Sequence, residues 1–387
     1  MPTLNLPVAG GKLAPFTTRP PRRFPAAQPP FTRIAYAAAH VVPDPLADTD
    51  PWLDAAIDWD ATIAFRRYLW SLGLGVAEAM DTAQRGMGVD WPTSLELIRR
   101  SLDAAEGTPG ALIASGAGTD QLEPSPSVTI HDVTAAYEEQ CGAIENLGGN
   151  IVLMASRALA KAARAPDDYQ KVYGRILDQV KEPVIIHWLG EMFDPALEGY
   201  WGYRDHYQAM EVALDVITTH AHKVAGVKVS LLDKDKEIAM RRHLPQGVRM
   251  FTGDDFNYAE LIAGDAHGYS DALLGIFDVI APAAAAALGA LTREEMRSFH
   301  DILAPTVPLS RHIFRAPTRF YKTGVVFMAY LNGLQNHFTM VGGQESARSS
   351  LHLAELFRLA DGAGLLLDPD QACARMRRVM AVRGIEA

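Results

Sequence analysis

Short apolar runs alternate with longer amphipathic segments over most of this chain, between residues 32 and 291. A continuous apolar run of about four to eight residues is typical of a buried strand, whereas apolar positions spaced three or four apart are typical of a helix. The runs predict strands at 32–42, 75–80, 110–115, 149–155, 183–188, 224–229, 248–252 and 266–270. The segments between them predict helices at 58–72, 93–105, 127–147, 166–181, 205–222, 233–244, 254–264 and 282–291.

Eight strand–helix units in one chain predict an α/β fold, a (β/α)8 TIM barrel, because each parallel strand needs a crossover helix. Such barrels take about 250 residues, so a chain of 387 leaves room for additions. We expect a Pro-rich N-terminal arm over 1–31, the barrel over 32–291, and a helical C-terminal extension over 292–387. Two helices of that extension are predicted at 319–336 and 346–362.

Charge and cysteine content narrow the class of protein. The net charge is −10, and the only basic cluster is Arg19–Arg23, so nucleic acid is not an expected partner. No stretch reaches the roughly 20 apolar residues of a membrane span, so no membrane association is expected either. Cys141 and Cys373 lie far apart in the sequence and are expected to be free thiols in a reducing cytoplasm. These features favour a cytoplasmic enzyme.

One lysine stands near the end of the β-branched run Val224–Ser230. A lysine is rarely buried without a partner, and an apolar surrounding lowers the pKa of its ammonium toward neutrality. The resulting amine is a nucleophile that condenses with a carbonyl group to form a Schiff base. Lys228 is therefore the leading candidate for a catalytic residue, and the alternative is a lysine at a strand end directed to solvent.

The residues after Lys228 strengthen the catalytic interpretation. Gly226 and Lys228 form a Gly-x-Lys strand, followed by the turn Gly253–Asp255, the segment Gly264–Gly268 and the dipeptide Ala281–Pro282. This ordered set resembles the dihydrodipicolinate synthase / N-acetylneuraminate lyase superfamily of class I aldolases. The resemblance covers roughly residues 32–300. It implies a barrel, a Schiff-base lysine at position 228, a small carbonyl substrate and a helical extension that supports an oligomer.

Two positions depart from the family pattern. The family binds the substrate carboxylate at a threonine-containing turn after its second strand, where this chain retains Thr82 beside Asp81. A carboxylate at Asp81 would repel a 2-oxo acid, unless Asp81 only caps a turn. His187 stands where the family has a proton-shuttling tyrosine. Histidine titrates near neutrality and can move protons, or it can be a core residue bonded to a backbone carbonyl.

Further substrate contacts are expected at the carboxyl ends of later strands, where barrel active sites form. Gly253 and Asp254 lie in the turn after the strand at 248–252, and Asp254 either meets substrate hydroxyls or caps the next helix. Ser270 ends the strand predicted at 266–270, so its hydroxyl is expected to face the substrate.

The sequence therefore predicts a Schiff-base-forming class I aldolase or lyase acting on a 2-oxo acid or keto sugar derivative, with the keto sugar favoured. It needs no cofactor and no metal, and it is expected to form a homodimer or homotetramer. One alternative is a divalent-metal sugar isomerase or class II aldolase on the same barrel. Its candidate ligands are His40, Glu78, Asp81, His187 and Asp254. Another is a barrel that binds ligands without catalysis.

Overall fold

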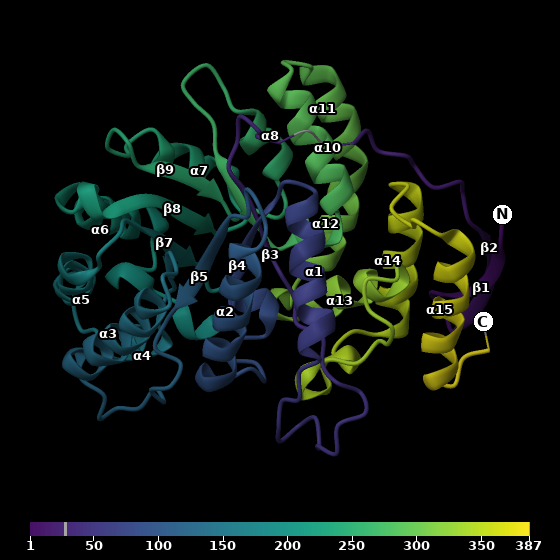
Figure 1. Cartoon of the computed structure of the whole chain (residues 1–387), viewed down its shortest axis with the longest axis horizontal. Helices are drawn as coiled ribbons and strands as arrows, with labels where there is room; N and C mark the ends of the chain where they lie inside the picture. Colours follow the sequence, from purple (N-terminus) through teal and green to yellow (C-terminus); the bar gives the residue numbers. More distant parts are fainter. Residues whose placement is uncertain (27–28, 387) are drawn as a thin grey trace.

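The computed structural model describes residues 1–26 and 29–386, and a closed barrel of eight parallel strands lies at its centre (Figure 1). Around the barrel the strands follow the order β10-β3-β4-β5-β6-β7-β8-β9. Their bounds are β3 Ala35–Ala38, β4 Gly75–Glu78, β5 Ile113–Ala117, β6 Ile151–Leu153, β7 Val184–Leu189, β8 Val224–Ser230, β9 Arg249–Thr252 and β10 Asp271–Leu274. The predicted TIM barrel is confirmed.

Helices connect successive strands and surround the barrel; the amphipathic segments predicted all of them except the short α4 and α9. They are α1 Trp59–Ser71, α2 Trp91–Glu106, α3 Ile130–Asn146, α4 Arg157–Ala162, α5 Pro166–Gln179, α6 His206–Thr219, α7 Lys234–Arg241, α8 Tyr258–Ala263, α9 Ile276–Val279 and α10 Ala281–Thr292. Capping side chains determine where several of these helices begin. Asp58, Asp90 and Asp205 each accept a hydrogen bond from a backbone N–H in the first turn of α1, α2 and α6. The helix boundaries are therefore largely a property of the local sequence.

Small side chains leave space for one large ring inside the barrel. The interior cluster contains Ala38, Ala77 and Ala114 together with Phe251 of β9. Gly226 of β8 accommodates that ring, because a Cβ at this position would lie 2.6 Å from a ring carbon of Phe251. The glycine two residues before Lys228 thus has a packing function in the barrel core.

The strand predicted at 266–270 is wrong. Residues 265–268 form a turn closed by a bridge between Asp265 and Gly268, and the strand is β10, Asp271–Leu274. Gly264 and Gly268 have φ values of 83° and 146°, which other residues rarely adopt, so the chain turns there. This displacement moves the expected strand end and changes the position of Ser270.

The C-terminal residues fold into helices that partly cover one side of the barrel (Figure 1). They are α11 Met296–Leu303, α12 Val307–Ile313, α13 Tyr321–Leu331, α14 Ser350–Gly362 and α15 Pro369–Val382. Helix α13 packs against α9, next to the barrel, and also against α15. Through this arrangement a residue at the start of α13 reaches the interior of the barrel end.

Much of the expected N-terminal arm is regular structure. Strands β1 Thr3–Val8 and β2 Lys12–Thr17 form an antiparallel hairpin that packs against α14 and α15 (Figure 1). Leu4 and Leu6 are buried in this contact. The N-terminal arm expected over 1–31 thus contains a hairpin over residues 3–17, and residues 27 and 28 of that arm lie outside the described residues.

Two further sequence expectations concern cysteines and membranes. Cys141 and Cys373 are both buried and unpaired, which agrees with the free thiols expected. Within residues 1–26 and 29–386, no helix has both the length and the apolar character needed to cross a bilayer.

Candidate active site

Lys228 lies in β8 with its side chain inside the barrel, where it is 7% exposed. Burial lowers the pKa of Lys228, while the negative charges of Asp81 and Asp255 oppose this shift. Gly253, at the end of β9, makes space for the lysine. A Cβ at Gly253 would lie 2.9 Å from Lys228 Cε and 2.2 Å from Ser230 Oγ. The pairing of β8 with β9 thus buries the lysine side chain against a glycine 25 positions later in the chain.

A small chamber surrounds the lysine side chain. Its free volume is about 10 Å³, near the smallest volume that holds one water molecule. The lining residues are Ala38, Met80, Asp81, Thr82, Leu189, Phe193, Lys228, Ser230, Asp255, Gly275 and Tyr321. Of the predicted site residues, Lys228, Asp81 and Thr82 therefore meet in one place.

His187 is the neighbour of Lys228 on the adjacent strand β7, in direct parallel register with it. Its Nε2 lies 3.2 Å from Ser230 Oγ, and its Nδ1 has no hydrogen-bond partner among the described residues. Burial, and then the positive charge of Lys228, lower the pKa of His187 well below its ordinary value. The imidazole is therefore neutral at neutral pH and can act as a proton acceptor.

The two aspartates of the Gly253–Asp255 turn have different roles. Asp254 accepts hydrogen bonds from the backbone N–H of Phe256 at 2.8 Å and of Asn257 at 3.1 Å, as a cap does. Asp255 instead lines the Lys228 chamber, and Ile276 N–H donates to its Oδ1 at 2.8 Å. Burial raises the pKa of Asp255 to about 7, although the Lys228 charge opposes the shift.

A hydroxyl pair closes the chamber. Thr82 Oγ1 and Tyr321 OH share a hydrogen bond of 2.8 Å, and both residues are buried. Burial raises the pKa of Tyr321 well above its ordinary value, so its hydroxyl stays protonated at neutral pH. Sequence reasoning missed Tyr321, which begins α13 and is 239 positions from Thr82. No local pattern marks such a contact.

Ser270 lies away from this chamber, contrary to expectation. It precedes β10 instead of ending a strand, and its hydroxyl donates to Glu237 Oε1 at 2.7 Å. Arg241 Nη1 donates to the same hydroxyl at 3.3 Å. Glu237 and Arg241 belong to α7, so Ser270 faces the helical layer. The argument for a substrate contact at Ser270 therefore fails.

The residues proposed as metal ligands are mostly engaged elsewhere. Glu78 accepts two hydrogen bonds from Arg66, at 2.8 and 2.9 Å, and one from Ser101 at 2.6 Å. His40 Nδ1 lies 2.7 Å from Asp278 Oδ2. In the part of the chain that the structure describes, no three His, Cys, Asp or Glu side chains are grouped so as to hold a metal ion. The geometry does not favour the metal-dependent alternative.

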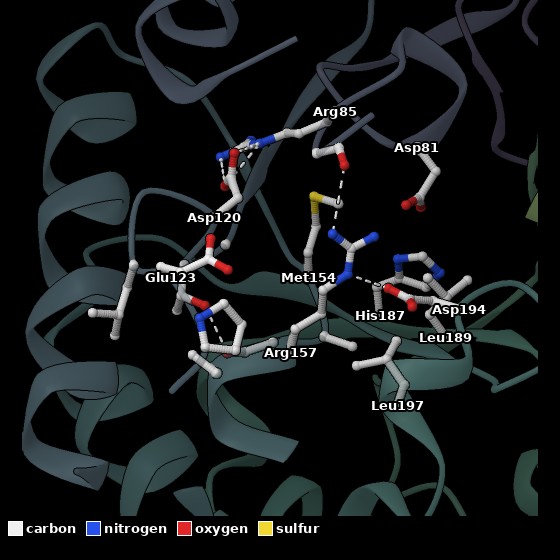
Figure 2. Close-up of a pocket in the computed structure, with 18 residues that line it drawn as sticks. Asp81, Arg85, Asp120, Glu123, Met154, Arg157, His187, Leu189, Asp194 and Leu197 are labelled. Carbon is white, nitrogen blue, oxygen red and sulfur yellow. Dashed lines mark hydrogen bonds and ion pairs between the residues drawn. The ribbon is translucent and has the colours of Figure 1, made fainter. Parts of the chain in front are cut away.

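Two larger cavities open beside the chamber, and Asp81 lines all three spaces. One has a volume of about 210 Å³ and includes His187 and Leu189 in its wall (Figure 2). Across it, Arg157 forms an ion pair with Asp194, and Arg85 forms one with Asp120 at 2.8 Å. The other, of about 330 Å³, is bounded by Arg157, Arg319 and Lys322 among others. A ligand longer than one carbonyl group has room in these cavities.

Comparison with known proteins identifies the family. A family model described as a protein of unknown function, DUF993, matches residues 4–385. The chain belongs to the DUF993 family. No curated protein matches this DUF993 chain in sequence.

Solved structures share the fold of the DUF993 chain. A putative dihydrodipicolinate synthetase from Pseudomonas aeruginosa is 15% identical with a TM-score of 0.64, covering 85% of this chain and 98% of its own. Dihydrodipicolinate synthase from Aquifex aeolicus is 11% identical with a TM-score of 0.65, covering 87% and 99%. A prophage protein of the same family from E. coli K12, in complex with pyruvate, is 12% identical with a TM-score of 0.67, covering 86% and 99%. The remote relation to this fold, expected from the sequence, is confirmed.

Proposed function

We propose that this protein is a Schiff-base-forming class I aldolase or lyase, and that Lys228 forms the covalent bond to a small carbonyl substrate. The observation that supports this most is a buried lysine in a chamber that also holds a carboxyl group titrating near neutrality and a hydroxyl pair. The fold shared with dihydrodipicolinate synthase structures agrees with the proposal. The fold alone would not establish this function, because barrels of the same architecture catalyse many different reactions.

The chamber contains the groups that Schiff-base chemistry needs. The neutral amine of Lys228 attacks the carbonyl carbon, and the carbonyl oxygen takes up two protons and leaves as water, which yields an iminium ion. Asp255 exchanges one proton, because its pKa of about 7 suits both directions near neutral pH. The Thr82–Tyr321 pair, which lines the same chamber, exchanges a second proton with the substrate oxygen.

The iminium then accepts an electron pair as the adjacent carbon–carbon bond breaks. That bond breaks when a hydroxyl on the departing carbon loses its proton and becomes a carbonyl. His187 is the base for this step, because it is neutral and its Nδ1 is unpaired among the described residues. It lies in the wall of the cavity that would hold the departing fragment (Figure 2).

The chamber favours a keto sugar derivative over pyruvate. Asp81 shares the chamber with Lys228, so a carboxylate bonded directly to the carbonyl carbon would meet a like charge. Substrate hydroxyls instead would donate hydrogen bonds to Asp81, whose carboxylate has no hydrogen-bond partner among the described side chains. Asp81 therefore selects for hydroxyl groups next to the reacting carbonyl.

Borohydride trapping tests the proposal. The full chain is incubated with pyruvate, other 2-oxo acids and a panel of keto sugars, reduced, and analysed by peptide mass spectrometry. We expect an added mass on the peptide containing Lys228, absent in Lys228→Met and retained in Lys161→Met, which alters an exposed lysine of α4. A folded protein that forms no adduct with any compound would refute the Schiff-base aldolase.

The oligomeric state and the domain boundaries expected from the sequence can be tested as well. We propose that the chain assembles as a homodimer or homotetramer, which sedimentation velocity at micromolar concentration would test. The boundaries of the barrel at 32–291 and of the C-terminal extension at 292–387 are tested by limited proteolysis, which would cut first near residues 31 and 292.

A further inference from the structure

The cavity of about 330 Å³ beside the Lys228 chamber is lined by more cationic than anionic side chains. It shares Asp81 and Phe193 with the chamber, so the two spaces are neighbours. Four cationic side chains and two carboxylates line it, and the complete lining is Asp81, Arg85, Met87, Arg157, Phe193, Asp194, Arg319, Phe320 and Lys322. Arg85 is already paired with Asp120 outside the cavity. Arg157 is paired with Asp194 of the same cavity wall, so Lys322 and Arg319 are the cations of this wall without a carboxylate partner among the described residues.

Lys322, in the first turn of α13, is the most informative of them because it is only 3% exposed. Its Nζ donates to the backbone oxygen of Arg319 at 3.2 Å and to the thioether of Met87 at 3.4 Å. Nζ also lies 4.6 Å from the centroid of the Tyr321 ring, a cation–π contact. A thioether is a weak acceptor, and no described carboxylate forms an ion pair with this ammonium. A buried ammonium with three donors is therefore incompletely satisfied on the wall of a cavity, which indicates a missing anionic partner.

The surroundings keep Lys322 charged at neutral pH. Burial lowers its pKa to about 8, the charges of Asp81 and Asp194 act in the opposite direction, and that of Arg157 adds to the lowering. A bound anion would raise the pKa again and stabilise the ammonium form. Below about pH 8 Lys322 therefore keeps its proton and gives the cavity wall a positive charge.

Arg319 and Arg157 supplement this charge. Arg319 is exposed and stacks on Phe320, with 4.9 Å from its guanidinium carbon to the ring centroid, and it forms no ion pair among the described residues. Arg157 is bonded to Asp194, and its Nη1 also donates to the backbone oxygen of Gly86 at 3.5 Å (Figure 2). Guanidinium groups bind carboxylates and phosphates through paired N–H donors. The wall thus combines one buried and two accessible cations.

We propose that this cavity binds an oxyanion, a phosphate ester or a carboxylate, at the end of the substrate remote from the reacting carbonyl, through Lys322, Arg319 and Arg157. That the oxyanion belongs to the substrate rests on the proposed function. The substrate would then be an anionic keto sugar derivative. The carbonyl meets Lys228, the hydroxyls pass Asp81, and the oxyanion reaches Lys322. The position of Asp81 between the two cavities agrees with this order.

Calorimetric titration of the full chain with simple anions tests the site without any substrate. The probes are sodium sulfate, inorganic phosphate and malonate, in wild type and in Lys322→Met, which removes the charge and retains the length. We expect an affinity about 10- to 100-fold lower in Lys322→Met, because a charge-assisted hydrogen bond is lost. Lys161→Met is the matched control, and Lys322→Arg should retain most of the binding. Tighter binding of phosphate and sulfate would indicate a phosphate ester, and tighter binding of malonate a carboxylate.

Lys228→Met separates this proposal from the aldolase. It should bind sulfate like wild type, because Lys228 does not line the larger cavity. Sulfate keeps its charge between pH 7 and 9, so its affinity should fall as the pH rises past about 8 and the Lys322 ammonium loses its proton. Equal sulfate affinity in wild type and a folded Lys322→Met, or no binding of any of the three anions to wild type, would overturn the oxyanion site. Neither result bears on the Schiff base, which is tested separately by adduct formation at Lys228.

Discussion

Replacing Gly253 by alanine tests the inference that this glycine makes space for the catalytic lysine. The added methyl would lie 2.2 Å from Ser230 Oγ, 2.7 Å from the backbone oxygen of Val229 and 2.9 Å from Lys228 Cε. The serine hydroxyl can rotate away, although it then leaves His187. The Val229 oxygen cannot move so easily, because it accepts the 2.8 Å hydrogen bond from Gly253 N–H that joins β8 to the turn.

The size of the effect follows from these contacts. Overpacking a buried position usually lowers the free energy of unfolding by about 1–3 kcal/mol, and a backbone obstacle favours the upper half of that range. Gly253 does not have a left-handed φ, so the strain would come from the contacts alone. Lys228 must also shift, and small displacements of a reacting group lower rates strongly. We expect Schiff-base formation to slow by about tenfold or more.

The assay compares Gly253→Ala with Gly142→Ala in urea unfolding and in the time course of borohydride trapping. Gly142 lies within α3, and a Cβ there would meet nothing within 4 Å. That control should leave trapping unchanged and raise the stability by about 0.5–1 kcal/mol, because alanine favours helix. A Gly253→Ala protein with wild-type stability and a wild-type trapping rate would show that the glycine does not position Lys228.

Three other outcomes are expected. Tyr321→Phe should slow turnover of a substrate identified by trapping, and it should lower the free energy of unfolding by about 1–3 kcal/mol because the buried Thr82 hydroxyl loses its partner. The exposed control Tyr207→Phe should change neither, and equal turnover in both variants would exclude a proton path through Tyr321. In Asp255→Asn, the inflection near pH 7 in the rate of adduct formation should disappear, since the group whose pKa is about 7 is gone; an unchanged pH profile would assign that inflection to another group. Burial and the charges of nearby cations lower the pKa of His352 to about 3, so only the unfolded chain takes up this proton as the pH falls below 6.5. Stability is therefore lost from about pH 6.5 downward, and His352→Phe should lose less stability than wild type between pH 7 and 4.5 in urea unfolding; an equal loss in both proteins would refute this.

Local sequence determined most of the scaffold. Strand and helix periodicities depend on neighbours a few positions apart, so seven strands and the barrel helices other than the short α4 and α9 could be predicted from them. The exception at 266–270 has a local explanation too. Two glycines with positive φ end a helix and form a turn there, and the apolar strand begins only after them, at Asp271.

The candidate site could be predicted only in part. Lys228, His187 and Thr82 were found because each lies in or directly after an apolar run, and the carboxyl ends of parallel strands meet at one face of a barrel. Sequence reasoning recognised the Gly253–Asp255 turn, but it could not decide which aspartate bonds the turn before α8 and which lines the chamber. That choice depends on which carboxylate reaches Ile276 N–H, 21 positions later.

Tyr321 and Lys322 could not be recognised as site residues from the sequence. They stand at the start of a helix in the C-terminal extension, and nothing in their neighbourhood marks chemistry. Packing of α13 against α9 brings Tyr321 to Thr82, 239 positions away, and brings Lys322 to the adjoining cavity. Local patterns determined which residues form strands and which lysine lies inside the barrel. Tertiary packing alone decided which distant hydroxyl and cation complete the site, because contacts across hundreds of residues leave no periodic trace in a single sequence.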